Sequence, residues 1–181
     1  MGPVISGAGM ILLSMIGQVH RLSDYWFTFF PGMLVFGLGM SLTVAPLTAT
    51  VMEAAGRQYS GVASGVNNAL SRVASVFANA VLGALAVVLF TGVVGRKVDG
   101  LGLDVRDRQA VMAETAKLGD AKVPEDVNWG ASGADGGVGA QVAAVYREGF
   151  IEVYQVILRI AAGLAFTGAL TVILFVKKGQ K

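Results

Sequence analysis

The stretch Gly61–Gly83, GVASGVNNALSRVASVFANAVLG, decides the fold. It is long enough to enter a lipid bilayer, yet it carries an arginine and three asparagines. Its polar and small residues recur at steps of three and four, which places them on one side of an α-helix. These residues are Ser64, Asn68, Arg72, Ser75, Asn79 and Gly83. Lipid does not accommodate such a face, so we expect it to meet protein or a water-filled path.

The composition is that of a membrane protein. Of 181 residues, 54% are hydrophobic and 14% are charged, whereas soluble domains carry about 25% charged residues. The 25 glycines are typical of membrane helices that pack closely. The absence of cysteine excludes disulfides and thiolate metal sites, and with a single histidine the sequence offers no cysteine or histidine nucleophile arrangement. A net charge of +2 does not indicate nucleic acid. We therefore expect a protein that is not an enzyme and has no metal or cofactor.

The hydrophobic pattern predicts an all-α integral membrane bundle with four transmembrane helices. Three of them, at about 3–19, 25–52 and 60–94, lie within residues 1–95, and the last covers 150–176. Residues 96–149 hold seven basic and nine acidic residues, which predicts an aqueous loop. Asp104 is a candidate N-cap for a short helix in this loop.

The first apolar run is shorter than the roughly 20 residues needed to span, and it starts abruptly at Gly2-Pro3. We expect it to continue a helix that begins earlier in a longer protein. Lysines in the tail 177–181 and Arg57 between the second and third helices predict that these segments are cytoplasmic. The long loop is then extracytoplasmic, in a multi-pass protein of the cell membrane.

Three further features bear on how the helices work. Pro46 lies inside the second apolar run and predicts a kink, either as a hinge for alternating access or as a static bend. Gly61 and Gly65 form a small-residue ridge that lets another helix approach closely. Glu53 ends the second helix, where it is either a proton site or a solvated carboxylate.

The second and third helices resemble a known family. The pieces that carry the resemblance are Gly37-x-Gly39, Ala45-Pro46-Leu47-Thr48, and Gly61-Val-Ala-Ser-Gly65-x-Asn67-Asn68 followed by Arg72. Together they resemble the late helices of the fourteen-helix drug:proton antiporters, the EmrB/QacA-type branch of the major facilitator superfamily. The resemblance covers about 50 residues closely, and the remaining elements fit by order and size.

The resemblance implies a partial major-facilitator fold, with the four helices as the last of fourteen. The second helix would then line the cavity, the third would be a gate helix, and the first and last would be outer supports. The acidic coupling residues and the glycine-rich antiporter motif of the family have no match in this chain. The partners implied are the lipid bilayer, the remaining helices of the same transporter, a small-molecule substrate and a proton.

Two interpretations of Arg72 stay open. It is either a gate or coupling residue that meets a carboxylate or substrate, or a structural arginine bound to helix ends or backbone carbonyls of neighbours. Both need a partner, because an arginine near the middle of the bilayer costs on the order of 3 kcal/mol. Asn68, Ser64 and Ser75 share its face, and we expect Asn79 to bond across helices.

The sequence therefore predicts the C-terminal part of a secondary active transporter that exports drugs or other amphipathic molecules in exchange for protons. The alternative is a stand-alone four-helix membrane scaffold that oligomerises through the Gly61 and Gly65 ridge.

Overall fold

The computed structural model describes residues 1–17, 25–124, 127, 129 and 137–176, and this part of the chain is helical without strands. The connection between the first two predicted helices, at residues 18–24, and the lysine tail 177–181 lie outside the described residues. Two compact units divide the chain. Unit 1 is Met1–Asn79 with Gln155–Lys181, and unit 2 is Ala80–Tyr154.

Three helices are long and apolar enough to cross a membrane: Tyr25–Gly56, Gln58–Leu101 and Val138–Val172. The first helix is shorter than the predicted span of about 3–19: α1 covers only Gly2–Ser14. Thirteen residues extend about 20 Å, against a hydrocarbon thickness of about 30 Å. The prediction is thus confirmed for an all-helical chain of membrane type, whereas the count of four spanning helices is not.

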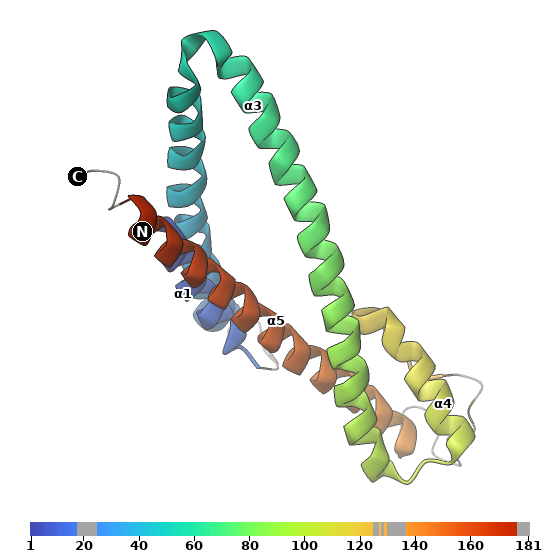
Figure 1. The fold of residues 1–181 in the computed structure, drawn as a ribbon. Coiled ribbons are helices and arrows are strands. Elements are labelled where there is room, and N and C mark those ends of the chain that lie inside the picture. The colour runs from blue at the N-terminus through green and yellow to red at the C-terminus, as the bar shows by residue number, and fades with distance from the viewer. Residues whose placement is uncertain (18–24, 125–126, 128, 130–136, 177–181) are drawn as a thin grey trace. The chain divides into compact units, whose positions relative to one another are not determined.

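The second and third predicted helices are two limbs of one long element. A π-helix at Tyr25–Phe29 leads into α3, Phe30–Val98, in which Gly56 is the non-helical residue with φ 72° and ψ 163°. Figure 1 shows α3 reversing its direction between the limbs. The connection between the second and third predicted helices is therefore the single residue Gly56, because a residue without Cβ adopts positive φ at no steric cost.

Pro46 does not interrupt the first limb. The backbone keeps helical angles from residue 30 to residue 55, so no local unwinding occurs at the proline. The nearby Ser41, Thr43 and Thr48 hydroxyls donate to carbonyls four residues earlier in the same helix, with distances of 2.7 to 3.1 Å. The role of Pro46 as a hinge stays a prediction.

In unit 1, α1 packs closely against the first limb of α3 (Figure 1). A Cβ added at Gly9 would lie 2.5 Å from the Phe36 backbone nitrogen, and one added at Gly39 would meet the backbone of Ser6. α1 also contacts α5, Val138–Val176: a Cβ added at Gly7 would lie 3.0 Å from the Phe166 ring. Just after α1, the Ile16 carbonyl accepts a hydrogen bond from the Gln155 side chain at 2.9 Å. The close approach explains why small residues occupy this interface.

Unit 2 has its own apolar core. Phe90, Val94 and Val98 recur every fourth residue on α3 and are fully buried. They face α5, where a Cβ at Gly149 would lie 3.2 Å from the Phe90 ring. Each fully buried valine or phenylalanine stabilises the unit by about 1.5–3 kcal/mol.

The segment between α3 and α5 folds over this core. It contains a 3-10 helix at Asp99–Leu101, α4 at Val105–Glu114 and a 3-10 helix at Thr115–Asp120. The Asp104 side chain accepts a hydrogen bond from the Val105 backbone N–H at 2.7 Å, which confirms it as the N-cap of the predicted short helix. The Tyr146 hydroxyl of α5 donates to the Val111 carbonyl of α4 at 2.7 Å and ties the two elements together.

Candidate functional site

The polar residues predicted from the sequence lie on the second limb of α3. We call Ser64, Asn68, Arg72, Ser75 and Asn79 the polar stripe. Residues 57–98 keep helical geometry, so these side chains share one face as the spacing predicts. Asn68, Arg72, Ser75 and Asn79 are exposed, and Ser64 is half-buried.

Arg72 has no hydrogen-bond or ion-pair partner among the described residues. Glu53, the acidic residue nearest along the fold, lies just before the reversal at Gly56 and is exposed. Arg72 is sixteen residues beyond Gly56, which is about 24 Å along the helix. Glu53 instead lines a small cavity of about 400 Å³ with Met52, Gly56 and Ser60. The two residues therefore belong to different places in unit 1.

The inner side of the reversal is apolar. A groove of about 590 Å³ lies there, and Val62, Val66 and Leu70 line it from the second limb. These residues are offset by two positions, or about 200° of helix rotation, from Ser64, Asn68 and Arg72. The polar stripe therefore faces away from the first limb, and the first limb does not supply its partner.

The apolar face of the second limb is exposed as well. Val73 is 67% exposed and Phe77 is 71% exposed. Around these residues the limb has no covering side chain among the described segments. An apolar face beside a polar one is the pattern of a membrane helix that meets lipid or apolar protein on one side and polar groups on the other.

The predicted docking ridge is also open. A Cβ added at Gly61 or at Gly65 would meet no described atom within 4 Å. The packing role of both glycines stays a prediction, because a partner helix would have to come from outside the described residues. The small residues that do mediate packing here are Gly9 and Gly39, with Gly2 and Gly32 at the same seven-residue spacing. The seven-residue spacing of these glycines is visible in the sequence and could have indicated this helix interface.

A second group of polar residues, which the sequence pattern did not single out, lies in unit 2. The Lys97 ammonium group of α3 lies 2.9 Å from a Glu148 carboxylate oxygen and 4.0 Å from Glu152 on α5. Near the end of α3, Arg108 pairs with Asp99 at 2.7 Å. All four side chains of these two closest pairs are at least one-third exposed, so such ion pairs contribute little stability, about 0–1 kcal/mol each. Both ion pairs lie at the C-terminal end of α3, where the apolar part of the helix gives way to charged residues.

Comparison with protein-family models, with curated proteins and with solved structures finds no match for this chain.

Proposed function

We propose that this chain is the C-terminal part of a secondary active transporter of the drug:proton antiporter type. It would export amphipathic small molecules while protons enter. The observation that supports this proposal is the polar stripe: it is largely exposed, Arg72 has no partner among the described residues, and the helix is apolar enough to cross a membrane. The sequence resemblance of the same helix to the late helices of such antiporters points the same way.

The energetic reason is the cost of polar groups in lipid. An arginine near the middle of a bilayer costs on the order of 3 kcal/mol, and the asparagines and serines beside it add to that cost. A partner carboxylate, a substrate or a water-filled path would remove it. Because the first limb lies on the other side of the helix, the partner would come from further helices of the same transporter.

The residues have distinct proposed roles. Arg72 would form the gate, where it pairs with a carboxylate in one state of the transporter and exchanges that partner in another. Asn68, Ser64 and Ser75 would donate and accept hydrogen bonds along the path, and Asn79 would bond across helices. Glu53, beside its small cavity, would be the proton site if this chain supplies one.

The proposed setting is the cell membrane. The lysine tail 177–181 and Arg57 favour a cytoplasmic side for the C-terminus and for the reversal at Gly56. The charged segment 96–149 would then lie on the extracytoplasmic side.

Transport by an Arg72→Ala variant tests the proposal. Cells producing the chain with the remaining helices are loaded with a fluorescent cationic dye, and its efflux is followed. Loss of a partnered buried charge should lower the efflux rate by at least about tenfold, which corresponds to 1.4 kcal/mol. Arg96→Ala is the matched control, because Arg96 is an exposed arginine of the same helix outside the polar stripe. Equal efflux by wild-type and Arg72→Ala at equal amounts of membrane protein contradicts the proposal.

The open ridge at Gly61 and Gly65 favours a second candidate, a membrane scaffold that oligomerises through this surface. Gly65→Leu should then abolish cross-linked oligomers of the chain, because a bulky side chain prevents close helix approach. Gly168→Leu on α5 is the control, since its surroundings are equally open. Oligomers that persist in Gly65→Leu exclude the scaffold that uses this ridge.

A further inference from the structure

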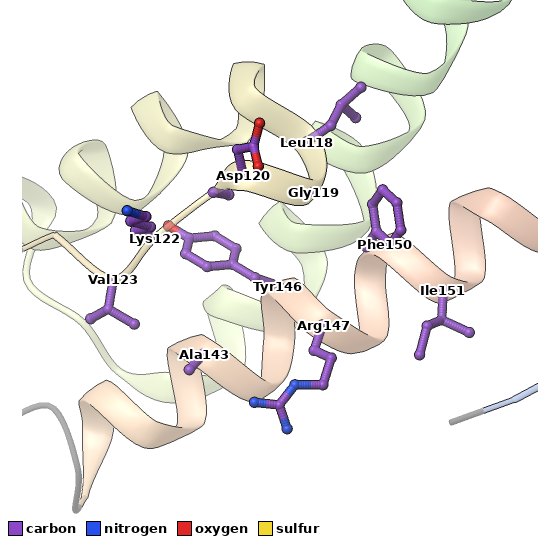
Figure 2. Close-up of a pocket in the computed structure, with 11 residues that line it drawn as sticks. Leu118, Gly119, Asp120, Lys122, Val123, Ala143, Tyr146, Arg147, Phe150 and Ile151 are labelled. Atoms are coloured by element: carbon purple, nitrogen blue, oxygen red, sulfur yellow. The ribbon is translucent and has the colours of Figure 1, made fainter. Parts of the chain in front are cut away.

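A cavity of about 580 Å³ lies in unit 2, between the segment 118–123 and α5. Figure 2 shows the segment crossing over α5, with Lys122 and Val123 above the Ala143 and Tyr146 end and Gly119 above Phe150. This volume is in the range of pockets that hold small molecules, about 300–1,000 Å³. Every lining residue belongs to unit 2 and is distinct from the polar stripe.

The backbone of the covering segment is held in an unusual conformation. Leu118 has φ 51° and ψ −116°, and it is the non-glycine residue with positive φ in the described part of the chain. Such a conformation is unfavourable for a branched side chain and persists only where the surroundings enforce it. Here it turns the segment so that Gly119 lies against the Phe150 ring, where an added Cβ would be 3.1 Å from the ring. The segment therefore forms the wall of the cavity opposite α5.

The lining of the cavity is amphipathic. Phe150, Ile151 and Val123 supply apolar surface, and the Phe150 side chain is 42% exposed although it belongs to an apolar cluster. The polar contribution of Tyr146 is already used, since its hydroxyl donates to the Val111 carbonyl. Its ring thus acts as part of the wall.

The charges at the cavity favour an anion. Lys122 and Arg147 are exposed, and neither side chain forms a hydrogen bond or an ion pair with the described residues. Among the described residues that line the cavity, Lys122 and Arg147 are the cations and Asp120 is the carboxylate. Lys122 lies on the covering segment and Arg147 on α5 (Figure 2). An ammonium or a guanidinium group binds carboxylate or phosphate oxygens through charge-assisted hydrogen bonds.

The order of these groups along α5 gives the cavity a direction. Arg147 precedes Phe150 and Ile151, and the apolar run of α5 continues after Val153. A bound molecule with an anionic head near Lys122 or Arg147 would thus place its apolar part against Phe150 and Ile151.

We propose that this cavity binds an anionic amphiphile, a molecule with a carboxylate or phosphate head and an apolar chain. A lipid such as phosphatidylglycerol and a free fatty acid share this chemistry. The site is independent of the proposed transport function, because it uses none of the residues assigned to the transport path.

Photo-crosslinking of the full chain tests this site. The protein is placed in nanodiscs of phosphatidylcholine, and two diazirine probes are used in separate arms: palmitic acid, and phosphatidylglycerol incorporated in the bilayer. Mass spectrometry then locates the cross-links. We expect cross-links on residues 143–151 and 118–123. They appear in the palmitic acid arm if the ligand is a free fatty acid, and in the phosphatidylglycerol arm if it is a membrane lipid. Unlabelled palmitate should compete in the fatty-acid arm and unlabelled phosphatidylglycerol in the lipid arm, while the uncharged methyl palmitate should compete in neither.

Variants separate charge from shape. Lys122→Gln with Arg147→Gln should lower the cross-link yield at these residues by at least about tenfold, because two charge-assisted contacts are lost. Ala143→Trp should lower it similarly by filling the cavity. Arg106→Gln, which removes an exposed charge of unit 2 outside the cavity, should leave the yield unchanged.

Three results would overturn the proposal. The first is no cross-link at these residues with either probe. The second is equal competition by methyl palmitate and by the charged competitor of that arm, which shows that the cations are not involved. The third is an equal yield in the double variant and in Arg106→Gln. The competition arm uses the wild-type chain, so it decides the question even if a variant fails to fold.

Discussion

Gly39 determines how closely α1 and the first limb of α3 approach. Its position faces the backbone of Ser6, and the Ser6 side chain is 4% exposed, with no hydrogen-bond partner for its hydroxyl among the described residues. Two helix backbones in such close contact gain packing energy that larger residues would prevent. Arg72 differs from Gly39 in that it is exposed and has no hydrogen-bond or ion-pair partner among the described residues.

Gly39→Ala should destabilise unit 1, because the added methyl group collides with backbone that cannot move aside. We expect a loss of about 1–3 kcal/mol, as for other overpacked sites. Gly37→Ala is the matched control: a Cβ there meets nothing within 4 Å, so alanine should be neutral or stabilising by up to about 1 kcal/mol. Thermal unfolding of both variants in detergent micelles measures the difference. Equal midpoints for the two variants would contradict the close contact.

At the scale of elements, α3 works as two limbs because one glycine breaks it. Gly56 has a backbone conformation that residues with a side chain rarely adopt, whereas Pro46 fits within the helix. A proline removes one hydrogen bond but need not unwind a helix, and the threonine and serine hydroxyls nearby bond to carbonyls of their own helix. The reversal of α3 thus depends on Gly56.

Gly56→Ala should therefore change the geometry of the two limbs within unit 1, and Pro46→Ala should not. The strain of alanine at this φ and ψ is about 1–3 kcal/mol, enough to favour another backbone conformation. Spin labels on cysteines replacing Thr48 and Gly65 report the distance between the limbs by electron resonance. A distance distribution that shifts in Pro46→Ala but not in Gly56→Ala would assign the hinge to the proline.

The segment of unit 2 after α4 should respond to pH. A hydrogen bond from the Lys117 side chain holds the pKa of Glu114 below its ordinary value of 4.5, and the Lys122 backbone N–H lowers this pKa further. A carboxyl group with a lowered folded pKa contributes stability that is present above pH 4.5 and lost as the pH falls through the folded value.

Hydrogen exchange of the Lys122 amide, corrected for intrinsic rates, should show protection at neutral pH that falls below pH 4.5. In Glu114→Gln the protection should be lower at neutral pH and independent of pH. The Arg108 amide, which donates to the Asp104 carbonyl within α4, serves as the reference. Protection of Lys122 that is unchanged from neutral to acidic pH would exclude this role of Glu114.

At the scale of the whole molecule, sequence periodicity predicted the helices well and their partners poorly. The polar stripe and the Asp104 cap follow from local spacing and capping chemistry. The cavity beside Tyr146 does not, because it depends on the backbone angles of Leu118 and on contacts between residues far apart in sequence. The position of the reversal at the single residue Gly56 could not be predicted from composition either, because composition shows which residues are polar but not their backbone angles.

The central claim is that the polar stripe of α3 meets protein or water in the membrane and that the opposite face meets apolar groups. The chain has no cysteine, so single cysteines at Ser75 and Phe77 can carry a nitroxide each without background. In lipid vesicles containing the protein with its remaining helices, collision with oxygen and with a water-soluble nickel complex distinguishes lipid, water and packed protein.

We expect low oxygen accessibility at Ser75, with nickel accessibility high if a water path lies there and low if packed protein does. At Phe77 we expect low nickel accessibility. High oxygen accessibility together with low nickel accessibility at Ser75 would mean that the polar stripe faces lipid. That result would contradict the claim.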